Sequence, residues 1–245
     1  MRHLLLFAAL MAVAAQAQDC SLSFTTPQFA VQVDSNVWYG NAPRYDGGTD
    51  SLFLNLYKPV GDGQTERPLI IFIHGGGFYA GHRNANNTAC YNLASAGWAA
   101  ATISYRLGFY GTWLFGPPYA HDPSEFRRAA YRSTQDTKGA IRYLKGRHAM
   151  DSTSTSAVFT FGGSAGAIAA LHAAYLDAPS EKPVDCGAIN DVQHILNFYP
   201  RPDLGGVDGD LHLNGYDASV LGLVNIFGAL IDTSMIASSD DAALF

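Results

Sequence analysis

Residues 157–176 read AVFTFGGSAGAIAALHAAYL, and this stretch decides the fold. Residues 157–161 are an apolar run of strand length, and the alanine-rich residues 165–176 favour a helix. Between them stands Gly-x-Ser-x-Gly, where a serine in a tight turn needs φ > 0 and small neighbours let strand and helix approach. We expect Ser164 to project its hydroxyl above a sheet. The Ala165 amide would then lie at a helix N-terminus, which favours an anion.

A second glycine-rich segment, His74-Gly75-Gly76-Gly77-Phe78, follows the apolar run 69–73 directly. Backbone without side chains can turn its amides into a cavity and stabilise an oxyanion that forms on a substrate carbonyl. Together with the serine turn, this loop predicts acyl transfer by a serine nucleophile.

Strand-like and helix-like segments alternate along the chain, which predicts the α/β class with a mostly parallel sheet covered on both faces. Residues 51–57 alternate apolar and polar side chains, as a half-exposed strand near a sheet edge would. The other predicted strands are 69–73, 98–104, 157–161 and 220–226, and the predicted helices are 84–96, the amphipathic 125–144, and 165–176. Residues 242–245 resemble the opening of one more strand.

Three features surround this framework. Residues 178–218, here named the excursion, are rich in Pro, Gly and Asp and would leave the sheet to form a wall over a site. Asp136 on its predicted helix is expected to form a structural ion pair with Arg106. A loop that is rich in aromatic residues is either a hydrophobic cap or a wall for an acyl or aromatic substrate. Its aromatic residues are Phe109, Tyr110, Trp113, Phe115 and Tyr119.

Composition excludes several classes of function. The 245 residues are 48% hydrophobic and 15% charged, which is typical of one well-packed domain and not of disorder. The net charge of −6 argues against a nucleic-acid partner. Nucleotide-binding glycine patterns and closely spaced metal-binding histidines are absent from the sequence, so we expect no cofactor and no metal.

The N-terminus has the pattern of an export signal: Arg2, an apolar run, and Ala15-Gln16-Ala17 at the cleavage spacing. We expect residues 1–17 to be removed, leaving residues 18–245 as a single domain in a secreted or periplasmic protein without a membrane span. Of three cysteines, Cys20, Cys90 and Cys186, two would form a structural disulfide in that compartment.

The sequence resembles the α/β-hydrolase esterases of the hormone-sensitive-lipase-like type. The resemblance rests on the HGGGF run, the GGSAG turn and several shorter matches. These are 37–40 (VWYG), 56–59 (LYKP), 67–68 (RP), 104–108 (SYRLG), 135–136 (QD) and 227–230 (FGAL). It implies that Ser164 is the nucleophile and that the amides of Gly76, Gly77 and Ala165 form the oxyanion hole. It also implies that His74 supports the glycine loop and is not the base.

The family's catalytic Asp and His would follow later strands than 220–226. The histidines after Ser164 are His172, His194 and His212, which we expect to be surface or packing residues, and Asp232 would be a displaced acid at most. We therefore expect the chain to be incomplete at its C-terminus, to lack the last strands, and to turn over esters weakly.

These observations predict a secreted serine hydrolase of carboxylic esters, either short-chain or carbohydrate-linked acetyl or feruloyl esters. The alternatives are a related serine peptidase, or a non-catalytic binding protein with a hydrolase fold. The oligomeric state is left open.

Overall fold

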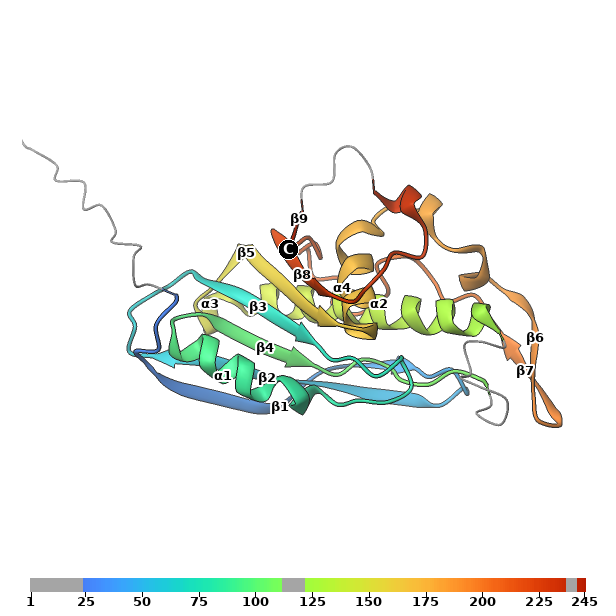
Figure 1. Ribbon diagram of the computed structural model, residues 1–245, viewed down its shortest axis with the longest axis horizontal. Helices are drawn as coiled ribbons and strands as arrows, with labels where there is room; N and C mark the ends of the chain where they lie inside the picture. The colour runs from blue at the N-terminus through green and yellow to red at the C-terminus, as the bar shows by residue number, and fades with distance from the viewer. Residues whose placement is uncertain (1–23, 112–121, 237–241) are drawn as a thin grey trace, which may run out of the picture.

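A seven-stranded sheet with the order β1-β2-β4-β3-β5-β8-β9 forms the centre of the computed structural model, which describes residues 24–111, 122–236 and 242–245 (Figure 1). Its strands are β1 (Ala30–Pro43), β2 (Thr49–Val60), β3 (Arg67–Ile73), β4 (Ala99–Ile103), β5 (Thr153–Gly163), β8 (Gly222–Ile226) and β9 (Ala243–Leu244). The α-helices are α1 (Asn87–Ser95), α2 (Pro123–Gly146), α3 (His148–Asp151) and α4 (Ala165–Tyr175). Short 3-10 turns are η1 (Arg83–Asn86), η3 (Pro179–Glu181), η4 (Val184–Cys186) and η5 (Thr233–Met235).

Strand pairing confirms the mostly parallel α/β class. β1 and β2 run antiparallel at one edge, whereas β4, β3, β5, β8 and β9 are parallel to one another. The half-exposed character expected for residues 51–57 is wrong, because Asn55 and Tyr57 are only 4% and 5% exposed. β1 covers the outer edge of β2, and the Asn55 amide donates to Asn84 and Asn87 at the start of α1.

The two faces of the sheet are covered by different helices. Leu69, Ile71 and Ile73 belong to the main core with residues of α2 and α4. Ile70 and Phe72 belong to a second core with Cys90 and Ala94 of α1. Because side chains alternate across a strand, the continuous apolar run of β3 supplies both cores.

Helix α2 is buried on its polar face as well as on its apolar face. The excursion packs along the polar face and includes the separate hairpin of β6 (Ile189–His194) and β7 (Asn197–Arg201). Arg128 donates to the carbonyls of Asp185, Gly187 and Pro202, and Arg142 donates to those of Asp208 and Leu211. An irregular segment leaves many carbonyls without a ladder partner, and these long side chains satisfy them.

The described cysteines, Cys90 and Cys186, are free and buried. The expected disulfide is therefore wrong for both of them. Burial raises the pKa of each thiol to about 12, so neither is a reactive thiolate at neutral pH. Cys20 and the predicted signal peptide lie outside the described residues. In the described parts of the chain, no helix is long and apolar enough to cross a membrane.

Candidate active site

Ser164 lies where β5 ends and α4 begins, with φ 55° and ψ −122°. The positive φ expected from the sequence is confirmed. The Ser164 amide donates to the carbonyl of Ile226 on the neighbouring β8 at 2.7 Å, and the Ser164 carbonyl accepts from Ala167 at 2.9 Å. Both contacts fix the backbone of the turn between the sheet and the helix.

The glycines of the turn are required by close backbone approach. A Cβ on Gly162 would collide with the carbonyl of Gly166, and a Cβ on Gly166 would collide with the carbonyl of Ile73 and lie 2.7 Å from that of His74. Helix α4 thus starts directly against the end of β3, which confirms the expectation that small residues let strand and helix approach.

The glycine loop lies against Ser164. A Cβ built on Gly75 would lie 3.3 Å from the Cβ of Ser164 and 2.8 Å from the carbonyl oxygen of Gly163. Gly76 and Gly77 follow with φ values of 123° and 61°, which favour glycine. The structure therefore brings together the two segments that the sequence analysis singled out, although they are 90 residues apart.

His74 holds the first peptide of this loop. Its Nδ1 lies 2.8 Å from the carbonyl oxygen of Gly75, and its ring stacks on Tyr105 with centroids 4.4 Å apart. Burial lowers the pKa of His74, which keeps the ring neutral near pH 7. A carbonyl oxygen can only accept a hydrogen bond, so Nδ1 of His74 carries the proton. In a trans peptide the N–H points opposite to the C=O, so the Gly76 N–H points away from His74.

The next peptide is oriented by the turn itself. The Gly76 carbonyl accepts from the amides of Tyr79 at 3.2 Å and Ala80 at 3.0 Å. The N–H of Gly77, in the same peptide unit, is therefore directed out of the turn. In the described part of the chain, the amides of Gly76, Gly77 and Ala165 have no hydrogen-bond acceptor. This leaves three donors free in the segments around Ser164.

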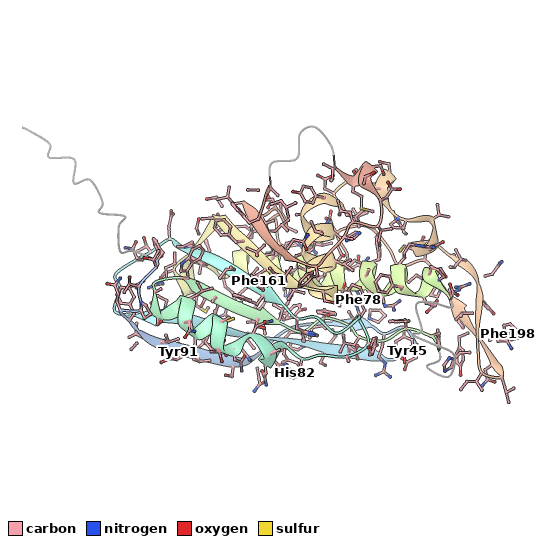
Figure 2. The ribbon with its side chains drawn as sticks, viewed as in Figure 1. Tyr45, Phe78, His82, Tyr91, Phe161 and Phe198 are labelled. Atoms are coloured by element: carbon pink, nitrogen blue, oxygen red, sulfur yellow. The ribbon has the colours of Figure 1, made fainter. Side chains whose placement is uncertain are left out.

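Two supports of the loop were missed by sequence reasoning. The Tyr105 hydroxyl donates to the His74 carbonyl at 2.7 Å, in addition to stacking on the ring. Gly81, with φ 102°, packs against the His74 ring and leaves no room for a Cβ. A fourth glycine close after HGGGF was the available signal. Phe78, labelled in Figure 2, anchors the end of the loop. Its ring contacts that of Phe126 of α2, with centroids 5.2 Å apart.

The later histidines are packing residues, as expected. His172 in α4 is 1% exposed; its Nδ1 lies 2.7 Å from the Ile168 carbonyl, and its Nε2 accepts from the Ile231 amide at 3.1 Å. His194 lies beside Tyr110 and Tyr199. Among the described residues, no histidine is hydrogen-bonded to Ser164.

Asp232 and His212 are also accounted for by local contacts. The Asp232 carboxylate accepts from the Ser234 amide and caps η5, and these hydrogen bonds lower its pKa. The His212 ring contacts the Tyr39 carbonyl and Tyr143. The role of displaced acid for Asp232 gains no support from this position.

The predicted ion pair of Arg106 and Asp136 is confirmed. Their side chains are 2.9 Å apart, and Asp136, which is fully buried, also accepts from the Arg106 amide at 2.7 Å. Phe109 and Tyr110 are buried, whereas Trp113, Phe115 and Tyr119 lie outside the described residues. No group of three or more His, Cys, Asp or Glu side chains within the described ranges is arranged to hold a metal ion.

Comparison with known proteins finds a family to which part of the chain is similar. Residues 16–122, which include the glycine loop, match the model of the Carboxylesterase family. The chain is 33% identical over 79 residues to the juvenile hormone esterase of Tribolium castaneum, covering 32% of this chain and 13% of that protein. It is 43% identical over 63 residues to the phenmedipham hydrolase of Pseudarthrobacter oxydans, covering 25% of this chain and 13% of that one.

A solved structure supports the same relationship at the level of fold. Thermogutta terrifontis esterase 2 superposes with a TM-score of 0.51 at 17% identity, covering 82% of this chain and 58% of that one. The chain thus spans 13% of each of the two matched relatives and 58% of this solved structure. Residues 16–122 are similar to the Carboxylesterase family, and the chain has the α/β-hydrolase fold of this esterase.

Proposed function

We propose that the protein hydrolyses carboxylic esters through an acyl-enzyme on Ser164. The observation that carries this proposal is the contact between the serine turn and the glycine loop. It places a strained, outward-turned serine beside amides that have no acceptor of their own. The names of the matched relatives, an esterase and a hydrolase, agree with it.

The reaction would proceed by nucleophilic substitution at the ester carbonyl. Ser164 Oγ bonds to the carbonyl carbon while the carbonyl oxygen becomes an oxyanion, which the amides of Gly76, Gly77 and Ala165 stabilise. Collapse of this intermediate breaks the bond to the alkoxy oxygen, which leaves as the alcohol with a proton. Water then attacks the acyl-enzyme, releases the carboxylic acid and regenerates Ser164.

Neutral His74 serves this step indirectly. By donating to the Gly75 carbonyl, it orients the peptide whose N–H faces the developing charge. It is a positioning residue, since its ring is tied to Gly75 and Tyr105 and not to Ser164.

We further propose that the protein is exported and acts on short-chain or carbohydrate-linked acetyl or feruloyl esters. The N-terminal signal pattern supports export, and export together with an acidic net charge suits an enzyme that trims such esters from polysaccharide. Chromogenic acetyl and feruloyl esters, assayed side by side, would separate the two acyl classes. Activity on a peptide bond alone would favour the serine peptidase alternative.

The direct test is covalent labelling. A fluorophosphonate should add to the Ser164-containing peptide of the folded chain, and the label should be absent from Ser164→Ala, as intact and peptide mass spectrometry would show. Unchanged labelling of that variant would refute the nucleophile. No labelling of the wild type and no ester turnover would leave the non-catalytic alternative as the better description.

A further inference from the structure

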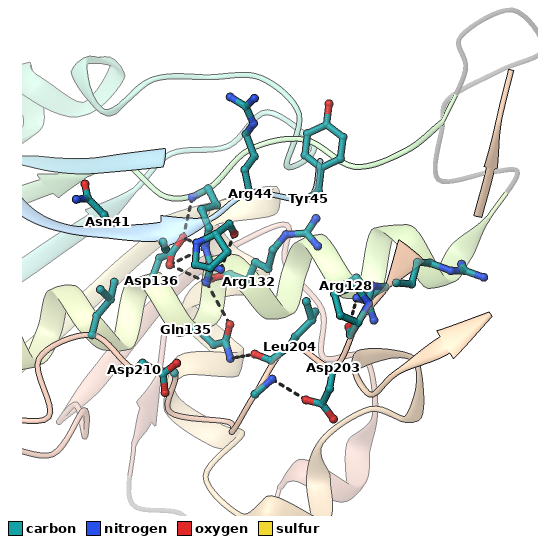
Figure 3. Close-up of a pocket in the computed structure, with 18 of the residues that line it drawn as sticks. Asn41, Arg44, Tyr45, Arg128, Arg132, Gln135, Asp136, Asp203, Leu204 and Asp210 are labelled. Atoms are coloured by element: carbon teal, nitrogen blue, oxygen red, sulfur yellow. Dashed lines mark hydrogen bonds and ion pairs between the residues drawn. The ribbon is translucent and has the colours of Figure 1, made fainter. Parts of the chain in front are cut away.

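A cavity of about 320 Å³ lies on the side of α2 that faces away from the glycine loop. Its walls are the end of β1 with the following turn, Arg106 and Tyr110 after β4, one face of α2, and two stretches of the excursion (Figure 3). At about 100° per residue, Arg128 and Arg132 lie about 200° and 240° around the helix from Phe126, which contacts the glycine loop. The cavity is therefore separate from Ser164, and nothing in the proposed ester chemistry uses it.

The cavity contains a buried cation without an ion-pair partner. Arg132 is 3% exposed, and its one hydrogen bond in the described chain runs from Nη2 to the Gly108 carbonyl at 2.9 Å. A guanidinium has five N–H donors, so most of those on Arg132 are unused. Neighbouring Arg106 is already paired with Asp136. Burial and the nearby Arg106 lower the pKa of Arg132 to about 10, which still leaves it charged at neutral pH.

A second arginine adds to this charge. Arg128 is also 3% exposed, and its hydrogen-bond partners in the described chain are all backbone carbonyls, which do not neutralise it. Burying two guanidinium groups without an ion pair is costly, and an anion between them would offset that cost.

The cavity also contains a free acceptor. Glu125 is 2% exposed, and its Oε2 accepts from the Tyr110 amide at 3.1 Å. Its Oε1 forms an ion pair with Arg201 at 3.6 Å but accepts no hydrogen bond from the described residues. A bare inorganic anion would be repelled by this carboxylate. A ligand that carries a hydroxyl group would instead donate to it.

The rim is aromatic. Tyr45 and Tyr110 pack edge to face with centroids 5.1 Å apart, and both line the cavity. Phenol rings combine an apolar face with a polar end and suit the C–H face of a sugar ring. The volume lies at the lower end of the range for small-ligand pockets, which fits a single ring of this size.

We propose that this cavity binds a small hydroxylated carboxylate of monosaccharide size, namely a uronic acid. The carboxylate lies against the fork of Arg132, a ring hydroxyl donates to Glu125 Oε1, and the ring lies against Tyr45 and Tyr110. Both hydrogen bonds are charge-assisted, since the first joins a guanidinium to a carboxylate and the second ends on the Glu125 carboxylate.

Calorimetric titration of the full chain with D-glucuronate and D-glucose tests this proposal. The two sugars share a ring and differ in the carboxylate, so glucuronate should bind and glucose should bind about ten- to hundredfold more weakly. Equal affinities, or no heat with glucuronate at millimolar concentrations, would overturn the proposal. Ser164→Ala should leave this binding unchanged, so that failure here is distinct from failure of the proposed ester hydrolysis.

Variants on α2 locate the ligand. Arg132→Met should weaken glucuronate binding about ten- to hundredfold. Arg127→Met, the same change five residues earlier on α2, should have no effect, because Arg127 pairs with Asp185 and does not line the cavity. If Arg132→Met binds glucuronate as the wild type does, Arg132 is structural and the proposal fails.

Glu125→Gln keeps the proposal testable if Arg132→Met does not fold. Removing the negative charge should strengthen the binding of sulfate, which needs only the arginines. It should weaken the binding of glucuronate, whose hydroxyl loses a charged acceptor. A parallel rise in both affinities would show a plain anion site and overturn the assignment of a hydroxylated ligand.

Discussion

Replacing Ser164 with glycine should make the protein more stable than replacing it with alanine. Ser164 adopts φ 55° and ψ −122°, a region that residues with a Cβ rarely occupy and that costs about 1–3 kcal/mol. Glycine relieves this strain but loses about 0.5–1 kcal/mol through its greater freedom in the unfolded chain. The net gain of Ser164→Gly over Ser164→Ala is about 0.5–2 kcal/mol. At about 2–4 °C per kcal/mol for a chain of this size, the difference in Tm is measurable.

Urea denaturation and a thermal melt of both variants, each lacking the hydroxyl, give the comparison directly. Ser133 in α2 is the matched control, because its backbone is helical and its side chain is buried. There, Ser133→Gly should be less stable than Ser133→Ala by about 1 kcal/mol. If Ser164→Gly were also the less stable of its pair, the turn would hold no strain and the structural argument for an activated position would be refuted.

Four further outcomes are expected. In a full-length version of the protein, Ser164→Ala should keep about a hundredth or less of the wild-type ester turnover and the wild-type circular dichroism spectrum, and higher residual turnover would exclude Ser164 as the nucleophile. The valine side chain of Gly76→Val would collide with the Ala80 carbonyl and displace the loop amides. With an acetyl ester as substrate, kcat should therefore fall by about 10²-fold or more, and KM should be measured beside it. Asp136→Asn should lower the free energy of unfolding by about 3–5 kcal/mol, because it leaves Arg106 buried without its counter-ion. Urea denaturation measures this change, and a decrease below about 1 kcal/mol would contradict the prediction. Burial lowers the pKa of His172 in the folded state, so the unfolded chain takes up the proton at a higher pH than the folded chain does. The free energy of unfolding should therefore decline as the pH falls below about 6.5. His172→Gln should flatten this decline, and an unchanged slope would mean that other groups cause it.

Local sequence patterns were enough to predict the segments that form the turn around Ser164. β3, β5 and α4 follow from short apolar runs and from glycine positions, because each requirement is set by neighbours in the sequence. That the glycine loop and Ser164 belong to one site was expected from the two motifs and the family resemblance. These are the parts of the site that the sequence predicts well.

Elements that depend on distant partners were missed. The hairpin of β6 and β7 carries no Asn-Gly or Gly turn signal, and Ile195 at its tip has φ 58°, an unusual conformation for a β-branched residue. The charged face of α2 looked solvent-exposed by its pattern, yet the excursion buries Arg132 and Lys138. The cavity beside Arg132 has walls from four separate parts of the chain, so no single stretch of sequence could indicate it.

The way in which α2 holds the excursion has a consequence for how this part of the chain tolerates change. Arg128, Gln135 and Arg142 bind main-chain oxygens, at residues such as Gly187, Leu204 and Leu211. A carbonyl is present whatever side chain a residue has, so these attachments survive substitution of the residues that are held. Diversity can therefore accumulate on the outer surface of the excursion, by natural variation or in a library, while three side chains of one helix keep its path unchanged.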